Sequence, residues 1–235
     1  GNNPCPYRDS NGKLQQVRRW PKSRFPDGNA ALSREPLPAI TPRDMSAVLI
    51  GASTGGPPVI QTILSGLKKN LPVPVLIVQH ISSGFLKGMV EWLQHTTALP
   101  VRIAADREVL LPGHVYFAPD DLHMGVTRGG IVSLSRTEPE NGSRPSVSHL
   151  FRSARKVYGE KLVGVLLTGM GKDGAYELKQ MKEHGAVTLV QDRESSVVYG
   201  MPGEAVRIDA ATYVLTPETI AEEIEGLASR SYGNL

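Results

Sequence analysis

The chain of 235 residues has little cysteine, few aromatic side chains and no long apolar run. Its single cysteine, Cys5, excludes an intramolecular disulfide and fits a reducing compartment. Aromatic residues make up only 6% of the chain, so the surfaces on which single-stranded nucleic acids stack are scarce. No apolar run approaches the ~18 residues that span a bilayer, and the N-terminus lacks the apolar core of a signal peptide. We therefore expect a cytoplasmic protein that does not insert into a membrane.

The basic charge of the chain is concentrated in its first 46 residues. The formal net charge is +3, and residues 1–46 carry eight basic and four acidic side chains, which leaves the remainder close to neutral. Because the rest of the chain has no excess of positive charge, we expect no nucleic-acid partner. Residues 1–46 also hold seven of the 18 prolines and little apolar periodicity. This composition predicts a poorly ordered linker or N-terminal extension before a folded domain over residues 47–235.

Short apolar runs alternate with amphipathic helical patterns after residue 46. Runs of this kind are typical of strands that are buried on both faces of a sheet. The predicted strands are Val48–Ile50, Val75–Val78, Val163–Leu167, Ala186–Val190 and Tyr213–Leu215. The predicted helices are Phe85–His95, Ala175–His184 and two that begin near Pro57 and Pro217. The alternation predicts an α/β fold, with a doubly wound, mostly parallel sheet and helices on both faces.

One region departs from this alternation. Val109–Arg136 has turn signals at Pro112-Gly113 and Gly129-Gly130, flanked by short apolar runs that include His114–Phe117. Two such runs around a glycine-rich turn favour antiparallel pairing, so we expect an inserted β-hairpin region here.

Three chemically active side chains follow predicted strands. Ser53 comes after the first strand, His80 after the second, and Asp173 lies in the glycine-rich turn after the third. Because the carboxyl ends of parallel strands meet at one edge of a sheet, we expect these groups to lie together. A hydroxyl, an imidazole and a carboxylate are the components of a nucleophile, a general base and an orienting acid.

The turn GASTGG around Ser53 has three interpretations. Gly51 to Gly55 match the nucleophile elbow G-x-S-x-G, in which a serine lies on a sharp turn between strand and helix. The turn is also a loose relative of G-x-G-x-x-G, although His80 replaces the acidic residue that a dinucleotide site requires. A serine that only caps the following helix is also common where a strand leads into a helix. Taken alone, His80 also fits a buried structural histidine and Asp173 a helix cap, so the combination of the three favours a hydrolase.

A second triad, Ser53, Asp173 and His184, would have the chain order of α/β-hydrolases. His184 lies eleven residues after Asp173, at the far end of a helix that spans ~15 Å. The two side chains would then lie at opposite edges of the sheet, which excludes this triad.

We expect no zinc site from these residues. With one cysteine in the chain, a zinc site would depend on histidine and carboxylate ligands. The remaining histidines show no close metal-ligand spacing: His114, His123 and His149.

Six long motifs follow one another along the chain: GASTGGPPVIQTIL, VLIVQHIS, GHVYFAPDDLHM, RPSVSHLFRSA, GVLLTGMGKDGA and VVYGMPGEAV. In this order they resemble the catalytic domain of bacterial chemotaxis protein-glutamate methylesterases, the CheB family. The resemblance covers roughly Ala47 to Leu227. It implies a catalytic domain, within residues 47–235, that demethylates glutamate methyl esters on the cytoplasmic domains of methyl-accepting chemoreceptors and also deamidates glutamines there. Members of this family usually carry an N-terminal receiver domain, which is absent from this chain.

The resemblance also implies roles for individual residues. Ser53 matches the family's nucleophile, His80 its base and Asp173 its acid. Thr54 and Met170 match residues that position the substrate and contribute to the oxyanion site. No metal or organic cofactor takes part.

One position departs from the family pattern. RPSVSHLF has Ser148 where aspartate is more usual. We expect this difference to affect a peripheral substrate contact and not the triad.

The sequence leaves two functions open besides ester hydrolysis. The chain could be a non-catalytic receptor-binding module that keeps the fold, although the intact set of serine, histidine and aspartate argues against this. It could also be a dinucleotide-dependent oxidoreductase. Tyr158-Gly-Glu-Lys161 misses the Y-x-x-x-K pattern of short-chain dehydrogenases by one residue.

Overall fold

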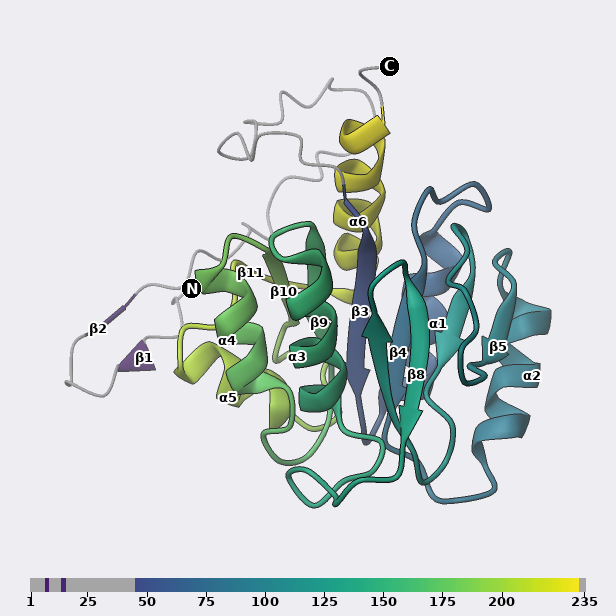
Figure 1. Ribbon diagram of the computed structural model, residues 1–235. Helices are drawn as coiled ribbons and strands as arrows, with labels where there is room; N and C mark the ends of the chain where they lie inside the picture. Colours follow the sequence, from purple (N-terminus) through teal and green to yellow (C-terminus); the bar gives the residue numbers. More distant parts are fainter. Residues whose placement is uncertain (1–6, 9–13, 16–44, 233–235) are drawn as a thin grey trace.

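The computed structural model describes residues 7–8, 14–15 and 45–232 (Figure 1). Within the predicted linker, residues 1–46, it describes a short antiparallel pair of β1 (Tyr7–Arg8) and β2 (Leu14–Gln15). Apart from Met45 and Ser46, the rest of that segment lies outside the described residues. Met45 is buried in the core, so the folded part includes residues just before the predicted boundary at 47.

The core of the fold is a sheet of seven strands in the order β11-β10-β9-β3-β4-β6-β5. Every pair of neighbours in this sheet is parallel. β3, β4, β9 and β10 are buried along their whole length, which explains their continuous apolar sequences. The strands are β3 (Ala47–Ala52), β4 (Val75–Gln79), β5 (Val101–Ile103), β6 (Val115–Phe117), β9 (Leu162–Leu166), β10 (Val187–Gln191) and β11 (Tyr213–Leu215).

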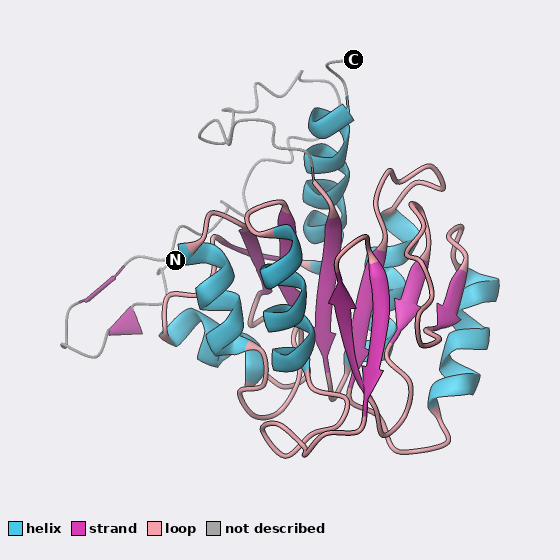
Figure 2. Cartoon of the chain, in the orientation of Figure 1, coloured by secondary structure: helices cyan, strands magenta, loops and turns pink. Residues whose placement is uncertain are grey.

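Helices pack on both faces of this sheet (Figure 2). One face carries α1 (Gly56–Gly66), α2 (Leu86–Thr96) and α6 (Pro217–Tyr232), and the other carries α3 (Val147–Tyr158), α4 (Ala175–Glu183) and α5 (Met201–Arg207). β3 supplies both cores alternately: Val48 and Ile50 pack on the first side, Ala47 and Leu49 on the second. The predicted doubly wound α/β fold is therefore confirmed.

The region predicted as an inserted hairpin divides into two parts. β7 (His123–Thr127) and β8 (Ile131–Ser135) form the antiparallel hairpin, as a separate two-stranded sheet. The run His114–Phe117 does not pair with them, because Val115–Phe117 is β6 and lies parallel to β4. Assigning that run to the hairpin was wrong. An apolar run of three or four residues does not specify its partner, which tertiary packing decides.

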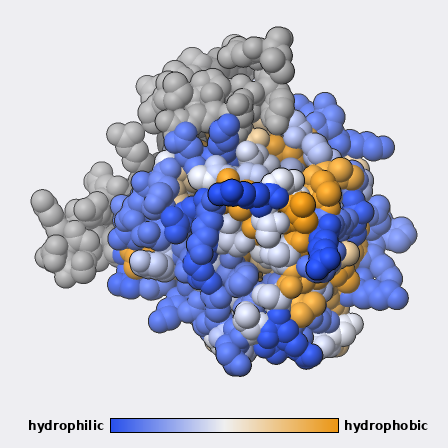
Figure 3. Space-filling model, in the orientation of Figure 1, coloured by the Kyte–Doolittle hydropathy of each residue, from blue (hydrophilic) through white to orange (hydrophobic). Residues whose placement is uncertain are grey.

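The described surface is largely hydrophilic, with apolar side chains gathered on one side of the face in Figure 3. Large apolar side chains that remain exposed include Phe85, Trp92, Met170 and Val197. Among the described residues, no helix combines the length and the apolar character needed to cross a membrane.

Phe151 on α3 offers a test of the core on the second face. Its side chain is fully buried, so Phe151→Ala should lower the free energy of unfolding by about 3–5 kcal/mol through lost burial and an unfilled cavity. The matched control is Phe85→Ala, because Phe85 is 68% exposed and its removal should cost less than about 0.5 kcal/mol. Urea denaturation measures both, and equal losses would contradict this packing.

Candidate active site

The backbone register of β3 and β4 places Ser53 beside His80. Ala52 and Gln79 are partners at the carboxyl ends of the two strands, and Ser53 and His80 follow them directly. The His80 amide donates a hydrogen bond to the Ala52 carbonyl at 2.9 Å, which extends the ladder by one residue. The two side chains predicted as nucleophile and base therefore leave the sheet at the same edge.

Asp173 reaches this edge from the turn that follows β9, the other neighbour of β3. Gly171 and Gly174 flank it with φ angles of +88° and +82°, a conformation that favours glycine. The turn brings the carboxylate to His80, whose Nε2–H donates to Asp173 Oδ2 at 3.0 Å. The predicted pairing of base and acid is present in the structure.

The N-terminus of α3 holds the other side of the Asp173 carboxylate. The Val147 amide donates to Oδ2 at 2.7 Å, and the Ser148 amide donates to Oδ1 at 3.0 Å. These are first-turn amides that the helix itself leaves unpaired, and the positive end of the helix dipole favours an anion there. The close approach requires glycine at residue 174, where a Cβ would lie 2.4 Å from the Val147 side chain.

Two side chains complete the hydrogen bonds of Asp173. Ser146 Oγ and Asn141 Nδ2 donate to Oδ1 at 2.9 and 3.0 Å. Burial by itself raises the pKa of Asp173, but the hydrogen bonds from His80, Ser148 and the Val147 amide outweigh it. The pKa is held well below the usual range of an aspartate. Asp173 is therefore a buried carboxylate that stays ionised.

Ser148 has a different place from the one expected. It is 2% exposed, its amide binds Asp173, and its Oγ accepts hydrogen bonds from Gly174 N and Asn141 Nδ2, both at 3.0 Å. The expectation of a peripheral substrate contact is corrected, because this side chain is buried beside Asp173. The small serine side chain fits this buried position, where its hydroxyl joins α3 to the turn that carries Asp173.

The His80 ring uses Nε2 for Asp173, so Nδ1 is the nitrogen left to face a proton donor. Two hydrogen bonds fix the main chain of Ser53: its amide donates to the Thr168 carbonyl at 3.0 Å, and its carbonyl accepts from Gly56 N at 2.8 Å. Main-chain hydrogen bonds to β3 and to the turn after β9 thus hold the backbones of His80 and Ser53.

Thr54 follows Ser53 directly and Met170 lies in the turn after β9, and both side chains are exposed. A Cβ on Gly169, the residue before Met170, would lie 2.7 Å from Ser53 Cβ, so the two turns are in close contact. Within the described part of the chain, no hydrogen bond uses the backbone amides of Thr54 and Met170. Among the described residues, the two turns that meet at Ser53 thus each carry an N–H group with no hydrogen-bond partner.

His184 lies away from this site. It ends α4, with Nδ1 hydrogen-bonded to the Gln180 carbonyl at 2.6 Å and Nε2 to Arg155 at 3.3 Å. Since Asp173 contacts His80 instead, the exclusion of a triad with His184 agrees with the structure.

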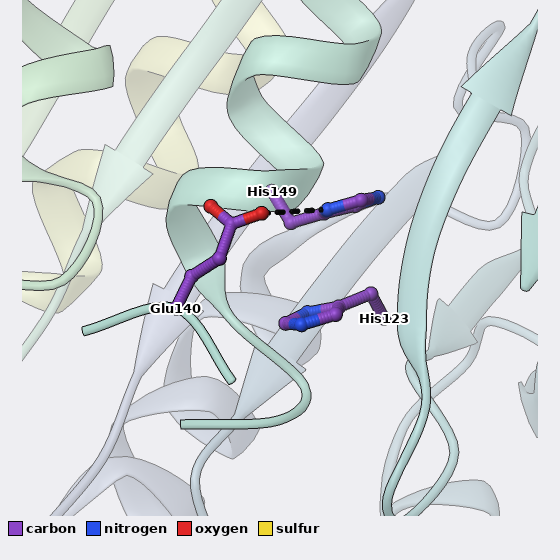
Figure 4. A group of neighbouring side chains, drawn as sticks. All are labelled: His123, Glu140 and His149. Carbon is purple, nitrogen blue, oxygen red and sulfur yellow. Dashed lines mark hydrogen bonds and ion pairs between the residues drawn. The ribbon is translucent and has the colours of Figure 1, made fainter. Parts of the chain in front are cut away.

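His123, Glu140 and His149 meet behind the site, a proximity that their spacing did not predict (Figure 4). Their potential ligand atoms lie within 4.8 Å of one another. Both His123 nitrogens are engaged, however: Ser146 N donates to Nδ1 at 3.2 Å, and Nε2 donates to a backbone carbonyl at 3.0 Å. The two rings stack with 15° between their planes, so their lone pairs do not converge on one ion, and Arg152 binds both oxygens of Glu140. The cluster is arranged for hydrogen bonding rather than for cation binding.

The chain matches a family model and several curated proteins. A family model described as CheB methylesterase matches residues 48–224. A protein-glutamate methylesterase/protein-glutamine glutaminase of Geobacter metallireducens is 55% identical over 217 residues, and one of Syntrophus aciditrophicus is 52% identical over 217 residues. Each alignment covers 92% of this chain but 62% of the relative, so the chain spans less than two thirds of these proteins.

A solved structure agrees with the sequence relatives. The crystal structure of the Thermotoga maritima CheB methylesterase catalytic domain is 38% identical, with a TM-score of 0.75. The match covers 78% of this chain and 98% of that one.

The lowered pKa of Asp173 predicts a specific pH dependence of stability. Its folded-state pKa lies below the unfolded value of ~3.9, so ionised Asp173 stabilises the fold above that value, and this stability is lost as the pH falls toward the folded pKa. The free energy of unfolding of the wild type should therefore fall more steeply from pH 6 to pH 3 than that of Asp173→Asn. Denaturant titrations at several pH values measure the two slopes.

Asp106→Asn is the control for that comparison, because the Asp106 side chain is 54% exposed. It replaces a surface carboxylate and leaves Asp173 in place, so its curve shows the effect of losing one exposed acid. A curve for Asp173→Asn that runs parallel to that of the wild type would show that the buried carboxylate contributes no such stability.

Proposed function

The chain belongs to the CheB methylesterase family, and on that basis we propose that it is a serine hydrolase that demethylates glutamate methyl esters. Its proposed substrates are the cytoplasmic domains of methyl-accepting chemoreceptors, and the proposed catalytic domain is residues 47–235. The observation that carries the proposal is the hydrogen bond between His80 and Asp173 at the sheet edge where Ser53 follows β3. A chemoreceptor substrate in the cytoplasm would place this protein in the same compartment.

The proposed reaction begins at Ser53. As Oγ attacks the ester carbonyl, His80 accepts its proton at Nδ1, and the negative charge of Asp173 stabilises the imidazolium that forms. The free amides of Thr54 and Met170 are suitable donors for the oxyanion, and one such donor is typically worth ~10²–10³ in rate. Collapse of the tetrahedral intermediate breaks the carbon–oxygen bond to the methoxy group, which leaves as methanol with the proton from His80.

A glutamyl ester on Ser53 is then the intermediate. Water attacks its carbonyl, His80 takes a proton from the water and returns it to Ser53 Oγ, and the glutamate side chain leaves as a free carboxylic acid. The same steps on a glutamine side chain would release ammonia in place of methanol. Deamidation of receptor glutamines is therefore proposed as a second reaction of this site, in line with the names of the relatives.

The surroundings of Ser53 suit a side chain presented by another protein. Met170 is 72% exposed and Val197 is 69% exposed, and a Cβ on Gly55 would lie 2.6 Å from Val197. Two apolar side chains thus border an open serine turn. A protruding methyl ester can reach such a turn while its own backbone stays on the surface of the substrate protein.

The oxidoreductase alternative has no support in the structure or the relatives. The family match includes the glycine-rich turn on which that alternative depended. A non-catalytic module would bind methylated receptor and release no methanol, so an activity assay distinguishes it from the proposed enzyme.

Methanol release from a methylated chemoreceptor cytoplasmic domain tests the proposal. Ser53→Ala and His80→Ala should each lower kcat by ~10³-fold or more, because each removes a group that takes part in bond making or proton transfer. His184→Ala is the matched control and should keep kcat within about twofold, since that ring lies at the end of α4. Full activity in Ser53→Ala, or a larger loss in His184→Ala than in His80→Ala, would overturn the assignment.

A further inference from the structure

Gln79 lies between the two strand ends that carry Ser53 and His80. It is the last residue of β4 and is 4% exposed. Its side-chain nitrogen donates two hydrogen bonds, one to the carbonyl of Ser53 and one to the carbonyl of His80, both at 2.8 Å. An amide nitrogen carries two hydrogens, so both are used to join the backbone of the nucleophile to that of the base.

The oxygen of the same amide has no comparable partner. Gln79 Oε1 is buried and makes no hydrogen bond within the described part of the structure. It faces Gly56, where a Cβ would lie 2.1 Å away. Leaving a buried acceptor unpaired is unfavourable, and such groups in native proteins call for an explanation.

The two carbonyl contacts supply that explanation. Reversing the amide of Gln79 would point its oxygen at the carbonyl oxygens of Ser53 and His80 and lose both hydrogen bonds. The orientation with an unpaired oxygen is therefore the better one. Gly56 makes room for it, since a larger residue at the start of α1 would displace the amide. The packing around Gln79 thus keeps both hydrogen bonds of the side-chain nitrogen, which bridge Ser53 and His80, and leaves the side-chain oxygen without a partner among the described residues.

We propose that Gln79 is a positioning residue of the active site, an inference that rests on the function proposed above. It fixes the distance between the main chains of Ser53 and His80 and touches neither the substrate nor the reacting atoms. Ser53 and His80 also make main-chain hydrogen bonds, but these bonds do not join one residue to the other. Ser53 bonds to Thr168 and Gly56, and His80 bonds to Ala52. Serine hydrolysis depends on alignment of hydroxyl and imidazole, and a shift of about 1 Å at a reacting pair costs on the order of 10² in rate.

Two substitutions remove the bridge while keeping the length of the side chain. Gln79→Met has no donor, and Gln79→Glu directs a carboxylate at two carbonyl oxygens. Both should lower kcat for methanol release from a methylated chemoreceptor domain by about 10- to 100-fold. KM should stay within twofold, because the substrate-facing groups remain. Phosphonylation of Ser53 by a small fluorophosphonate should slow by the same factor as kcat.

Thr188→Val is the matched control for loss of a buried hydrogen bond. Thr188 lies on β10, is fully buried, and its Oγ1 donates to the Ala210 carbonyl at 2.7 Å. This variant should lose thermal stability as the Gln79 variants do, yet keep kcat and the phosphonylation rate within twofold of the wild type. A purely structural glutamine would give the same result as Thr188→Val.

The outcomes separate this inference from the proposed function. A wild type that releases no methanol and is not phosphonylated contradicts the proposed function itself. An active wild type together with a folded Gln79→Met that keeps kcat and phosphonylation within twofold contradicts the role of Gln79 alone, as does a loss that appears only in KM.

A measurement on the unmodified protein covers the case in which the variants do not fold. Both side-chain amide protons of Gln79 should exchange with solvent at least 100-fold more slowly than those of a free glutamine amide, as read by NMR. Fast exchange of either proton would contradict the bridge.

Discussion

The site depends on one buried charge. Asp173 lies almost entirely out of water, and it stays ionised because His80, the side chains of Ser146 and Asn141, and the first amides of α3 all donate to it. Oδ2 accepts only from His80 and the Val147 amide, so removing either donor leaves part of a buried carboxylate unsatisfied. That loss is far more costly than losing a hydrogen bond at the surface. The acid of the proposed triad therefore also anchors α3 to the carboxyl edge of the sheet.

This anchoring constrains the elements around it. Gly51 on β3 and Gly174 in the turn after β9 both lie against Val147, where an added Cβ would approach to 2.4 Å. The start of α3 can approach the carboxylate only because these two positions lack side chains. Parallel strands then bring Ser53 and His80 to the same edge, since β3 lies between β4 and β9. Fold and site are thus built from the same close contacts.

The sequence predicted those parts of the structure that depend on local pattern. Continuous apolar runs identified β3, β4, β9 and β10, and the residues that follow three of them supplied Ser53, His80 and Asp173. The parallel arrangement made their meeting predictable without any contact being known. β6 was misassigned because its run of three residues, Val115–Phe117, pairs with a strand 40 positions earlier in the chain rather than with the adjacent hairpin.

The groups that support the triad were not predictable in the same way. Asn141, Ser146 and Ser148 lie 25 to 32 positions from Asp173, and nothing in their local sequence indicates a buried carboxylate. Gln79 was missed for another reason: it ends an apolar strand, and the sequence does not show that its side chain bonds the carbonyls of Ser53 and His80. A polar residue at the end of an otherwise apolar strand, one position before a candidate base, is the signal that could have identified it.

Capture of the covalent intermediate is the most direct test of serine hydrolysis by this site. After rapid acid quench of a reaction with a short methylated receptor peptide, mass spectrometry should find the peptide joined through a glutamyl ester to the fragment that contains Ser53. An adduct on any other residue, or turnover in single-turnover experiments with no adduct at any time, would contradict it.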